Sequence, residues 1–211
     1  MTAQTVSPLR AARRTSADKI GDRRRELAES ALLTLGERGY ARTSLREIAS
    51  NSEFSHGVVH YYFQDKQELI VYCVRHYKAR CVHRYDGVVA ESRTAAGLLE
   101  AFLDKLAETV AEDAPMHRLW YDLRSQSMFE ASLREAVTGI DRALEEMIWR
   151  VVARYAELSG TEPAVTSPVV YGIFDGLFQQ ALLGHLAGRP DALDRLRAQA
   201  RQALALIFPA R

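Results

Sequence analysis

The chain has 211 residues, 47% of them hydrophobic and 26% charged, which is ordinary for a globular protein. The formal net charge of +1 conceals an asymmetry: residues 1–80 contain 14 Lys and Arg against 9 Asp and Glu, whereas residues 81–211 contain 14 against 18. The basic excess that suits a phosphate partner therefore lies in the first part. The absence of a membrane-length apolar run, of a signal-like start and of CxxC spacing argues against secretion and membrane insertion and favours a reducing cytoplasm.

The N-terminal segment, residues 1–17, has few large apolar residues and three arginines, Arg10, Arg13 and Arg14. We expect a mobile basic arm, which either reaches phosphate and the adjacent minor groove or is a simple tail. From residue 18 to 37 the pattern becomes helical, because apolar residues recur every four positions and a glycine follows the end.

Two short helices are predicted next. Ser44 and Glu47 form a capping box that starts the first, and the polar break at residues 51–53 ends it. Ser55 then caps a second helix that runs to about Tyr62. Two short helices joined by a tight turn are typical of a helix-turn-helix, whose second helix enters the major groove of DNA.

A capping signal at Asp65 starts a longer helix, which we expect to continue into the eighties. Proline and glycine punctuation then predicts helices at about 94–110, 115–127, 131–158, 168–186 and 190–207. No stretch shows strand-like alternation. The sequence therefore predicts an all-α chain, with a three-helix helix-turn-helix domain at 18–64 and a helical ligand-binding and dimerisation domain at 65–211, in which residues 65–90 link the two.

The predicted helix-turn-helix resembles the DNA-binding module of the TetR family of one-component bacterial repressors. The matching positions are Thr43-Ser44, Ile48-Ala49, Phe54-Ser55, Gly57, Tyr61-Tyr62-Phe63 and Lys66-Gln67-Glu68-Leu69. One turn position that is usually glycine holds Glu53, which would cost about 1 kcal/mol if the backbone there needed positive φ. The later stretch IFDGLFQQALL resembles the penultimate dimer helix of the BetI-like branch of this family.

The resemblance implies a homodimeric repressor that binds a palindromic, double-stranded operator and is released by an unknown small-molecule effector. It also assigns DNA contacts. Bases would be faced by His56, Gly57, Val58, His60, Tyr61 and Arg46, and phosphates would be held by Thr43, Ser44, Tyr62, Lys66 and the backbone near Ser55. For each residue alone, ordinary packing or solvation remains open.

Large aromatic residues gather on the later predicted helices. Each alone fits ordinary core packing, but as a set they predict an apolar pocket with two polar groups, Arg124 and Asp175. The predicted ligand-binding residues are Met116, Trp120, Tyr121, Arg124, Trp149, Tyr171, Phe174, Asp175 and Phe178.

The segment VVYGIFDGLFQQALLGHLAG is apolar on more than one face and contains Gly172 and Gly176, which permit close approach of another helix. We expect a second copy to pack there, in a four-helix interface that includes part of residues 131–158. Two-fold symmetry would place the two recognition helices about one DNA turn, or a multiple, apart.

Two alternatives are weighed against this interpretation. An enzyme is disfavoured, because His56 and His60 have metal-ligand spacing but no third ligand, and no nucleophile elbow, P-loop or GxGxxG occurs. The sequence therefore predicts no catalytic residue, metal or cofactor. The second alternative is a helical small-molecule-binding or interaction protein of the same fold without operator binding, for which Glu53 is the only hint.

Overall fold

The computed structural model describes residues 16–209, and all regular structure in that range is helical, which confirms the all-α prediction. The elements are α1 (Ser16–Arg38), α2 (Leu45–Ser50), α3 (His56–Tyr62), α4 (Lys66–Cys81), α5 (Asp86–Glu91), α6 (Ala95–Glu112), α7 (Ala114–Gln126), the 3₁₀ turn η1 (Ala131–Leu133), α8 (Arg134–Ser159), α9 (Ser167–Leu186) and α10 (Ala192–Ile207). Residues 1–15 of the predicted arm lie outside the described range.

The predicted linking helix is shorter than expected, because α4 ends at Cys81 and a separate short helix, α5, follows. Between them the backbone changes to tighter hydrogen bonds, with the amide of Arg84 donating to the carbonyl of Cys81 at 3.0 Å. This turn brings Tyr85 into the core, where it is 2% exposed and its ring lies 5.1 Å from that of Phe102.

Two predicted starts also shift. The segment from residue 131 begins as a 3₁₀ turn, so that α8 starts at Arg134. Pro190 was expected in the first turn of the last helix, but α10 begins at Ala192. Pro115 and Pro168 do occupy the first turns of α7 and α9, where a missing N–H costs nothing.

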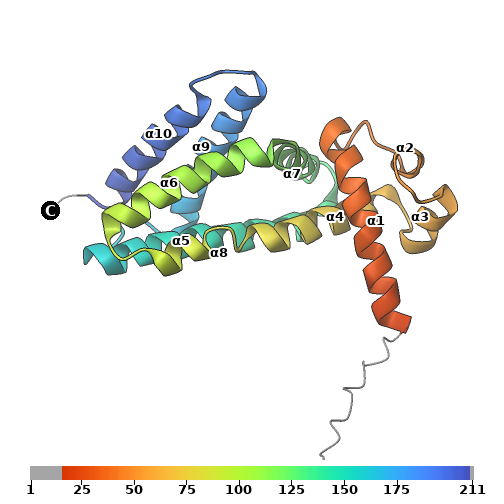
Figure 1. The fold of residues 1–211 in the computed structure, drawn as a ribbon, viewed down its shortest axis with the longest axis horizontal. Coiled ribbons are helices and arrows are strands. Elements are labelled where there is room, and N and C mark those ends of the chain that lie inside the picture. The colour runs from red at the N-terminus through yellow and green to blue at the C-terminus, as the bar shows by residue number, and fades with distance from the viewer. Residues whose placement is uncertain (1–15, 210–211) are drawn as a thin grey trace, which may run out of the picture.

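Helices α1, α2 and α3 form what we call the head (Figure 1). Their apolar faces meet in a small core that includes Leu27, Leu35, Ile48, Val59 and Phe63, each at most 1% exposed. The head therefore buries the helix faces that the apolar spacing predicts and leaves the opposite faces free.

Helix α4 packs against the head with its first half and against the rest of the protein with its second half. Its first half places Leu69 and Ile70, both fully buried, with the residues of the head, and α4 packs extensively on α1. Its second half carries Tyr77, Lys78 and Cys81 into the remainder of the protein, which we call the body (α5 to α10). The head and the body therefore share a single continuous hydrophobic core. A movement of α4 would disturb the packing of both.

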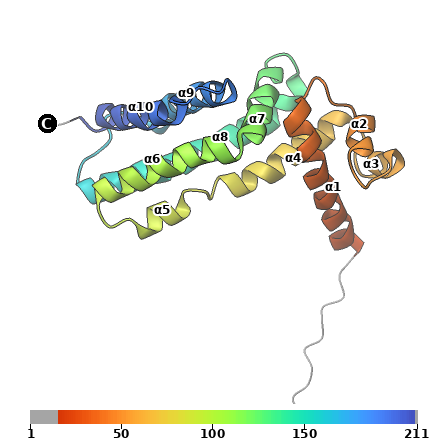
Figure 2. The same ribbon diagram turned by 45° about the horizontal axis from the view of Figure 1, so that its top comes forward.

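In the body, α9 and α10 cover the face of α6 and α8 opposite to α5 (Figures 1 and 2). Phe102 of α6 and Phe174 of α9 meet edge to face at 5.5 Å in the middle of these layers. Among the described residues no helix is both long and apolar enough to span a membrane.

Candidate nucleic-acid interface and internal cavity

The two short helices of the head are held by local caps. Ser44 and Glu47 form the predicted capping box, and the Ser55 hydroxyl accepts a hydrogen bond from the amide of Val58 at 3.3 Å. Phe54 is 3% exposed and anchors the turn between the helices. Glu53 does not adopt positive φ, so the energetic objection to a non-glycine residue there disappears.

The outward face of α3 is available to a partner. His56, Gly57, His60 and Tyr61 are exposed, with Tyr61 at 76%, while Val58 and Tyr62 are half-buried. The rings of His56 and His60 meet at 4.4 Å, and those of Tyr61 and Tyr62 at 5.0 Å. No acidic side chain occurs on α3, so this face does not repel phosphate.

Gly57 is unusual within α3 because nothing in the protein requires a glycine there. Its φ is not positive, and a Cβ added at this position would meet nothing nearer than the Ser55 Oγ at 4.0 Å. The missing side chain therefore leaves open space on the outer surface of the helix.

Three of the predicted phosphate contacts, Thr43, Ser44 and Lys66, lie around an open groove between α2, α3 and the start of α4, whereas Tyr62 and Ser55 do not border it. Thr43, Ser44, His60 and Lys66 border this groove, as does Arg42, which sequence reasoning missed. The Thr43 side chain itself is 1% exposed and donates to the carbonyl of Gly39 at 2.8 Å, so it braces the loop. Arg46 is exposed on α2.

Lys66 is oriented by an aromatic ring, because its Nζ lies 4.4 Å from the centre of the Tyr40 ring. The Tyr40 hydroxyl donates to Glu130 of the body at 3.0 Å. Burial, together with this carboxylate, raises the pKa of Tyr40 to about 12, so the hydroxyl remains a donor at neutral pH.

Helix α7 connects the head to the body at the end of α1. The Asp122 Oδ2 accepts the amide hydrogen of Tyr40 at 2.6 Å, and Arg118 donates to the carbonyls of Gly36 and Glu37, at 2.9 Å for the latter. The two helices are in close contact at Gly36, where an added Cβ would lie 3.3 Å from Pro115 Cβ and 2.2 Å from Met116 Cε, the movable end of that side chain.

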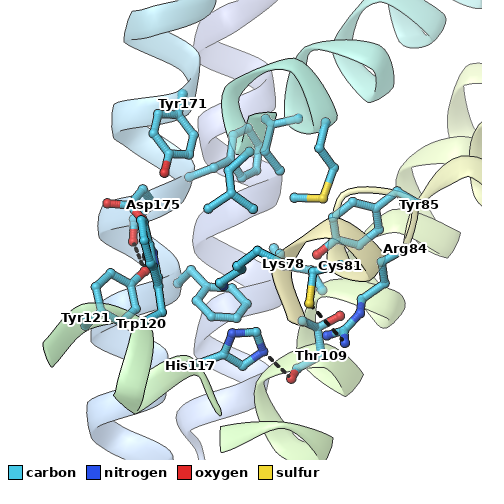
Figure 3. Close-up of a pocket in the computed structure, with 16 residues that line it drawn as sticks. Lys78, Cys81, Arg84, Tyr85, Thr109, His117, Trp120, Tyr121, Tyr171 and Asp175 are labelled. Carbon is cyan, nitrogen blue, oxygen red and sulfur yellow. Dashed lines mark hydrogen bonds between the residues drawn. The ribbon is translucent and has the colours of Figure 1, made fainter. Parts of the chain in front are cut away.

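The body contains a partly open cavity of about 60 Å³ between α4, α6, α7, α8 and α9 (Figure 3). Six of the predicted ligand-binding residues line it: Trp120, Tyr121, Tyr171, Phe174, Asp175 and Phe178. Three lie elsewhere: Met116 packs toward α1, Trp149 against the core, and Arg124 behind Asp175. The lining residues not predicted are Lys78, Cys81, Arg84, Tyr85, Leu106, Thr109, His117, Leu144, Met147 and Ile148.

The acidic side of the cavity is a closed network. Arg124 pairs with Asp175 at 2.5 Å and with Asp141 at 3.3 Å. The Tyr121 hydroxyl donates to Asp175 at 3.0 Å, and the Tyr171 hydroxyl donates to Asp141 at 2.6 Å. Burial and these carboxylates raise the pKa of both tyrosines. Both hydroxyls therefore stay protonated at neutral pH and donate these hydrogen bonds.

The opposite side is basic. Lys78 is 4% exposed, and burial lowers the pKa of its ammonium to about 8. His117 is held by a hydrogen bond to the Thr109 carbonyl at 3.1 Å, and burial followed by the charge of Lys78 lowers its pKa to about 3. His117 is therefore neutral at pH 7. Within the described part of the chain, no group of three or more His, Cys, Asp or Glu side chains is placed to hold a metal ion.

The outward face of α9 carries an apolar stripe. Val169, Leu183 and Leu186 are 48%, 62% and 42% exposed. Gly172 and Gly176 lie along the same face, and a Cβ added at either would meet nothing within 4 Å. Leu206 of the neighbouring α10 is 76% exposed. We call these residues the α9 stripe.

A helix-turn-helix head with an open recognition helix, joined by α4 and α7 to a larger helical body, is the architecture of helix-turn-helix transcription regulators. Residues 27–73 match the family model of bacterial regulatory proteins of the tetR family, and residues 95–209 match the C-terminal model of BetI-type transcriptional repressors. The chain belongs to the tetR family of transcriptional regulators, and its body is of the BetI type.

Individual relatives agree with this assignment. The HTH-type transcriptional regulator BetI of Burkholderia mallei is 30% identical over 175 residues, which are 80% of this chain and 84% of that protein. Two solved structures share the fold. The regulator FadR from Bacillus subtilis, in complex with stearoyl-CoA, has a TM-score of 0.69 at 14% identity and covers 89% of this chain and 99% of its own. A transcriptional regulator from Saccharomonospora viridis, in complex with choline, has a TM-score of 0.69 at 17% identity, with 90% and 100% covered.

Proposed function

We propose that this regulator is a homodimeric repressor that binds a palindromic operator through α3 and leaves it when a small-molecule effector enters the body cavity. The observation that carries the proposal is the arrangement of α7. One face of this helix supplies Trp120 and Tyr121 to the cavity, and another supplies Arg118 and Asp122 to the head.

The DNA contacts proposed for α3 follow from its exposed residues. Tyr61 and His60 face base edges, and the open space at Gly57 permits close approach of the DNA backbone. Positive charge for phosphates around the groove comes from Lys66, Arg42 and Arg46. The Tyr40 ring holds the Lys66 ammonium in place. The caps at Ser44 and Ser55 keep both helices in register for these contacts.

A second copy is proposed to cover the α9 stripe. Exposed leucines beside two unfilled glycine positions let another α9 pack closely, so that the four helices α9 and α10 of the two copies form the interface. This interface differs from the expected one, which included part of residues 131–158.

The effector would act by binding one arrangement of α7 better than the other. A ligand larger than the cavity of about 60 Å³ would displace lining residues, Trp120 and Tyr121 of α7 among them, and the contacts from Arg118 and Asp122 would carry that shift to the head. Solved relatives with stearoyl-CoA and choline support a ligand site in a body of this kind. We place the protein in the cytoplasm and assign it no catalysis.

The test is fluorescence anisotropy of the purified chain with DNA from upstream of its own gene and with a scrambled control, at two salt concentrations. A regulator binds the upstream fragment preferentially and with a steep salt dependence. Equal, weak binding to both fragments would instead favour a helical binding protein without operator recognition.

A further inference from the structure

Some polar side chains around the cavity have hydrogen-bond partners for all their polar atoms, and others do not. On one side, Asp175 has partners for both carboxylate oxygens, Tyr121 on Oδ1 and Arg124 on Oδ2. On the other side, Lys78 lies in the middle of the cavity wall (Figure 3). Within residues 16–209 its Nζ makes no hydrogen bond or ion pair, although the carboxylates of Asp175 and Asp113 are near enough to favour its charged form. The Lys78 Nζ lies 5.3 Å from the centre of the Trp120 ring and 5.6 Å from the centre of the Tyr77 ring.

Two further donors of the cavity lining lack an acceptor. Arg84 donates one terminal nitrogen to Asp113, but its Nη1 is buried and unpaired within the described chain. The Trp120 Nε1 is likewise buried without a partner. The lining residues thus include three donors without acceptors, and two of these donors are cationic. Buried donors of this kind cost free energy unless an acceptor arrives, and charged ones cost most.

We propose that the cavity takes a small organic anion, a short-chain carboxylate, whose oxygens accept hydrogen bonds from Lys78 and the neighbouring donors. Its apolar tail would lie against Phe174, Phe178 and Leu144, which line the same cavity. This proposal rests on the proposed function, because the ligand is the effector of that cavity, and it specifies the effector's chemical class.

The hydrogen-bond partners of the charged groups decide between an anion and a cation. Aromatic walls attract cations, so Trp120 and Phe178 alone would suit a quaternary ammonium ligand. However, Asp175 and Asp141 share Arg124 and also accept hydrogen bonds from Tyr121 and Tyr171, so their oxygens are already occupied. A bound cation would lie beside the Lys78 ammonium, which has no direct ion pair in the described chain. An anion removes that repulsion and supplies the missing acceptor.

The protonation state of Lys78 is compatible with this role. Because its pKa is about 8, most of the ammonium is charged at pH 7, and a bound carboxylate would stabilise the charged form further. His117, which faces the same cavity, is neutral at this pH and adds no competing charge.

The experiment is isothermal titration calorimetry of the full chain at pH 7 with straight-chain carboxylates from acetate to hexanoate, their neutral amides, and choline. We expect the best carboxylate to bind at least 10-fold more tightly than its amide. Lys78→Met should remove at least 10-fold of the carboxylate affinity and less than 2-fold of the amide affinity. Lys105→Met, which removes an ion-paired lysine on the surface of α6, is the matched control and should change neither.

Three results would overturn the proposal: equal affinity for carboxylate and amide, preferential binding of choline, or no detectable binding of any carboxylate in the series. Circular dichroism checks the folding of Lys78→Met. If that variant fails to fold, the comparison of carboxylate and amide affinities in the wild type still tests whether the cavity prefers an anion. Anisotropy with upstream DNA on the same preparation separates the two proposals. Specific DNA binding without carboxylate binding rejects only the ligand class, and the reverse rejects only the regulator function.

Discussion

The carboxylate of Asp122 in α7 accepts the backbone N–H of Tyr40 at 2.6 Å, directly after the positive-φ residue Gly39 that ends α1. This contact ties the loop between α1 and α2 to the helix that also lines the cavity. An added Cβ at Gly39 would lie 3.0 Å from the same carboxylate oxygen, so the close approach and the positive φ both favour glycine here.

Asp122→Ala tests this connection. It leaves the Tyr40 amide without its acceptor, and we expect the free energy of unfolding to fall by about 1 to 3 kcal/mol. Asp122→Asn keeps an acceptor oxygen and should lose less than half as much. Urea denaturation measures both, and equal losses in the two variants would show that the hydrogen bond is unimportant.

Gly57→Ala distinguishes an effect on DNA binding from an effect on stability. Alanine has better helix propensity, and the protein leaves room for its Cβ, so stability should stay the same or rise by up to about 1 kcal/mol. DNA affinity should nevertheless fall at least 10-fold, because the methyl group occupies the outer surface of α3. Thermal melting and anisotropy give the two readings, and undiminished DNA binding would contradict the proposed docking of this helix.

Tyr61→Ala tests base recognition. The ring is 76% exposed, so the free energy of unfolding should change by less than about 0.5 kcal/mol. Binding to the specific operator should weaken by about 1 to 3 kcal/mol, while binding to scrambled DNA stays nearly constant. If both affinities fall equally in anisotropy titrations, Tyr61 does not read bases.

His117→Gln tests the buried neutral imidazole. Its pKa is about 3 in the folded protein and about 6.5 when unfolded, so the unfolded chain binds the extra proton between these values and wild-type stability falls as pH drops from 6.5. Removing the imidazole should flatten this dependence by up to about 1.4 kcal/mol per pH unit. Urea denaturation between pH 7 and pH 4.5 measures it, and identical slopes for variant and wild type would refute the assignment.

Leu183→Glu tests the α9 stripe. Because this side chain is 62% exposed in the single chain, the substitution should leave the fold intact but convert a dimer to a monomer. Light scattering coupled to size-exclusion chromatography reports the mass. Leu33→Glu, on α1 and 72% exposed, is the control and should leave the dimer unchanged. A Leu183→Glu variant that remains dimeric would place the interface elsewhere.

The helix-turn-helix was predictable because its determinants are local. The caps at Ser44, Ser55 and Asp65 each bond an amide three residues away, so short sequence patterns locate the helix starts within a residue. The turn after Cys81 was missed, because it depends on the burial of Tyr85 against a distant helix, which no local pattern specifies.

The cavity was only partly predictable for the same reason. Aromatic residue type suggested Trp120 and Phe174, but it also suggested Trp149, which the packing of α8 places outside the cavity. Lys78 was missed because lysine usually lies on the surface. Its position four residues after the buried Val74 and eight after Ile70 was the available signal, since that spacing puts it on the buried face of α4.

The sharing of α4 between head and body limits how such regulators can be recombined. A chimera joined at residue 64 would separate the head from Leu69 and Ile70, whose fully buried side chains complete its core. The turn between Val82 and Tyr85 is a better junction, because it follows the last residue of α4. Grafting this operator specificity onto another sensor therefore means transferring the entire fourth helix, and with it the lysine that points into the sensor.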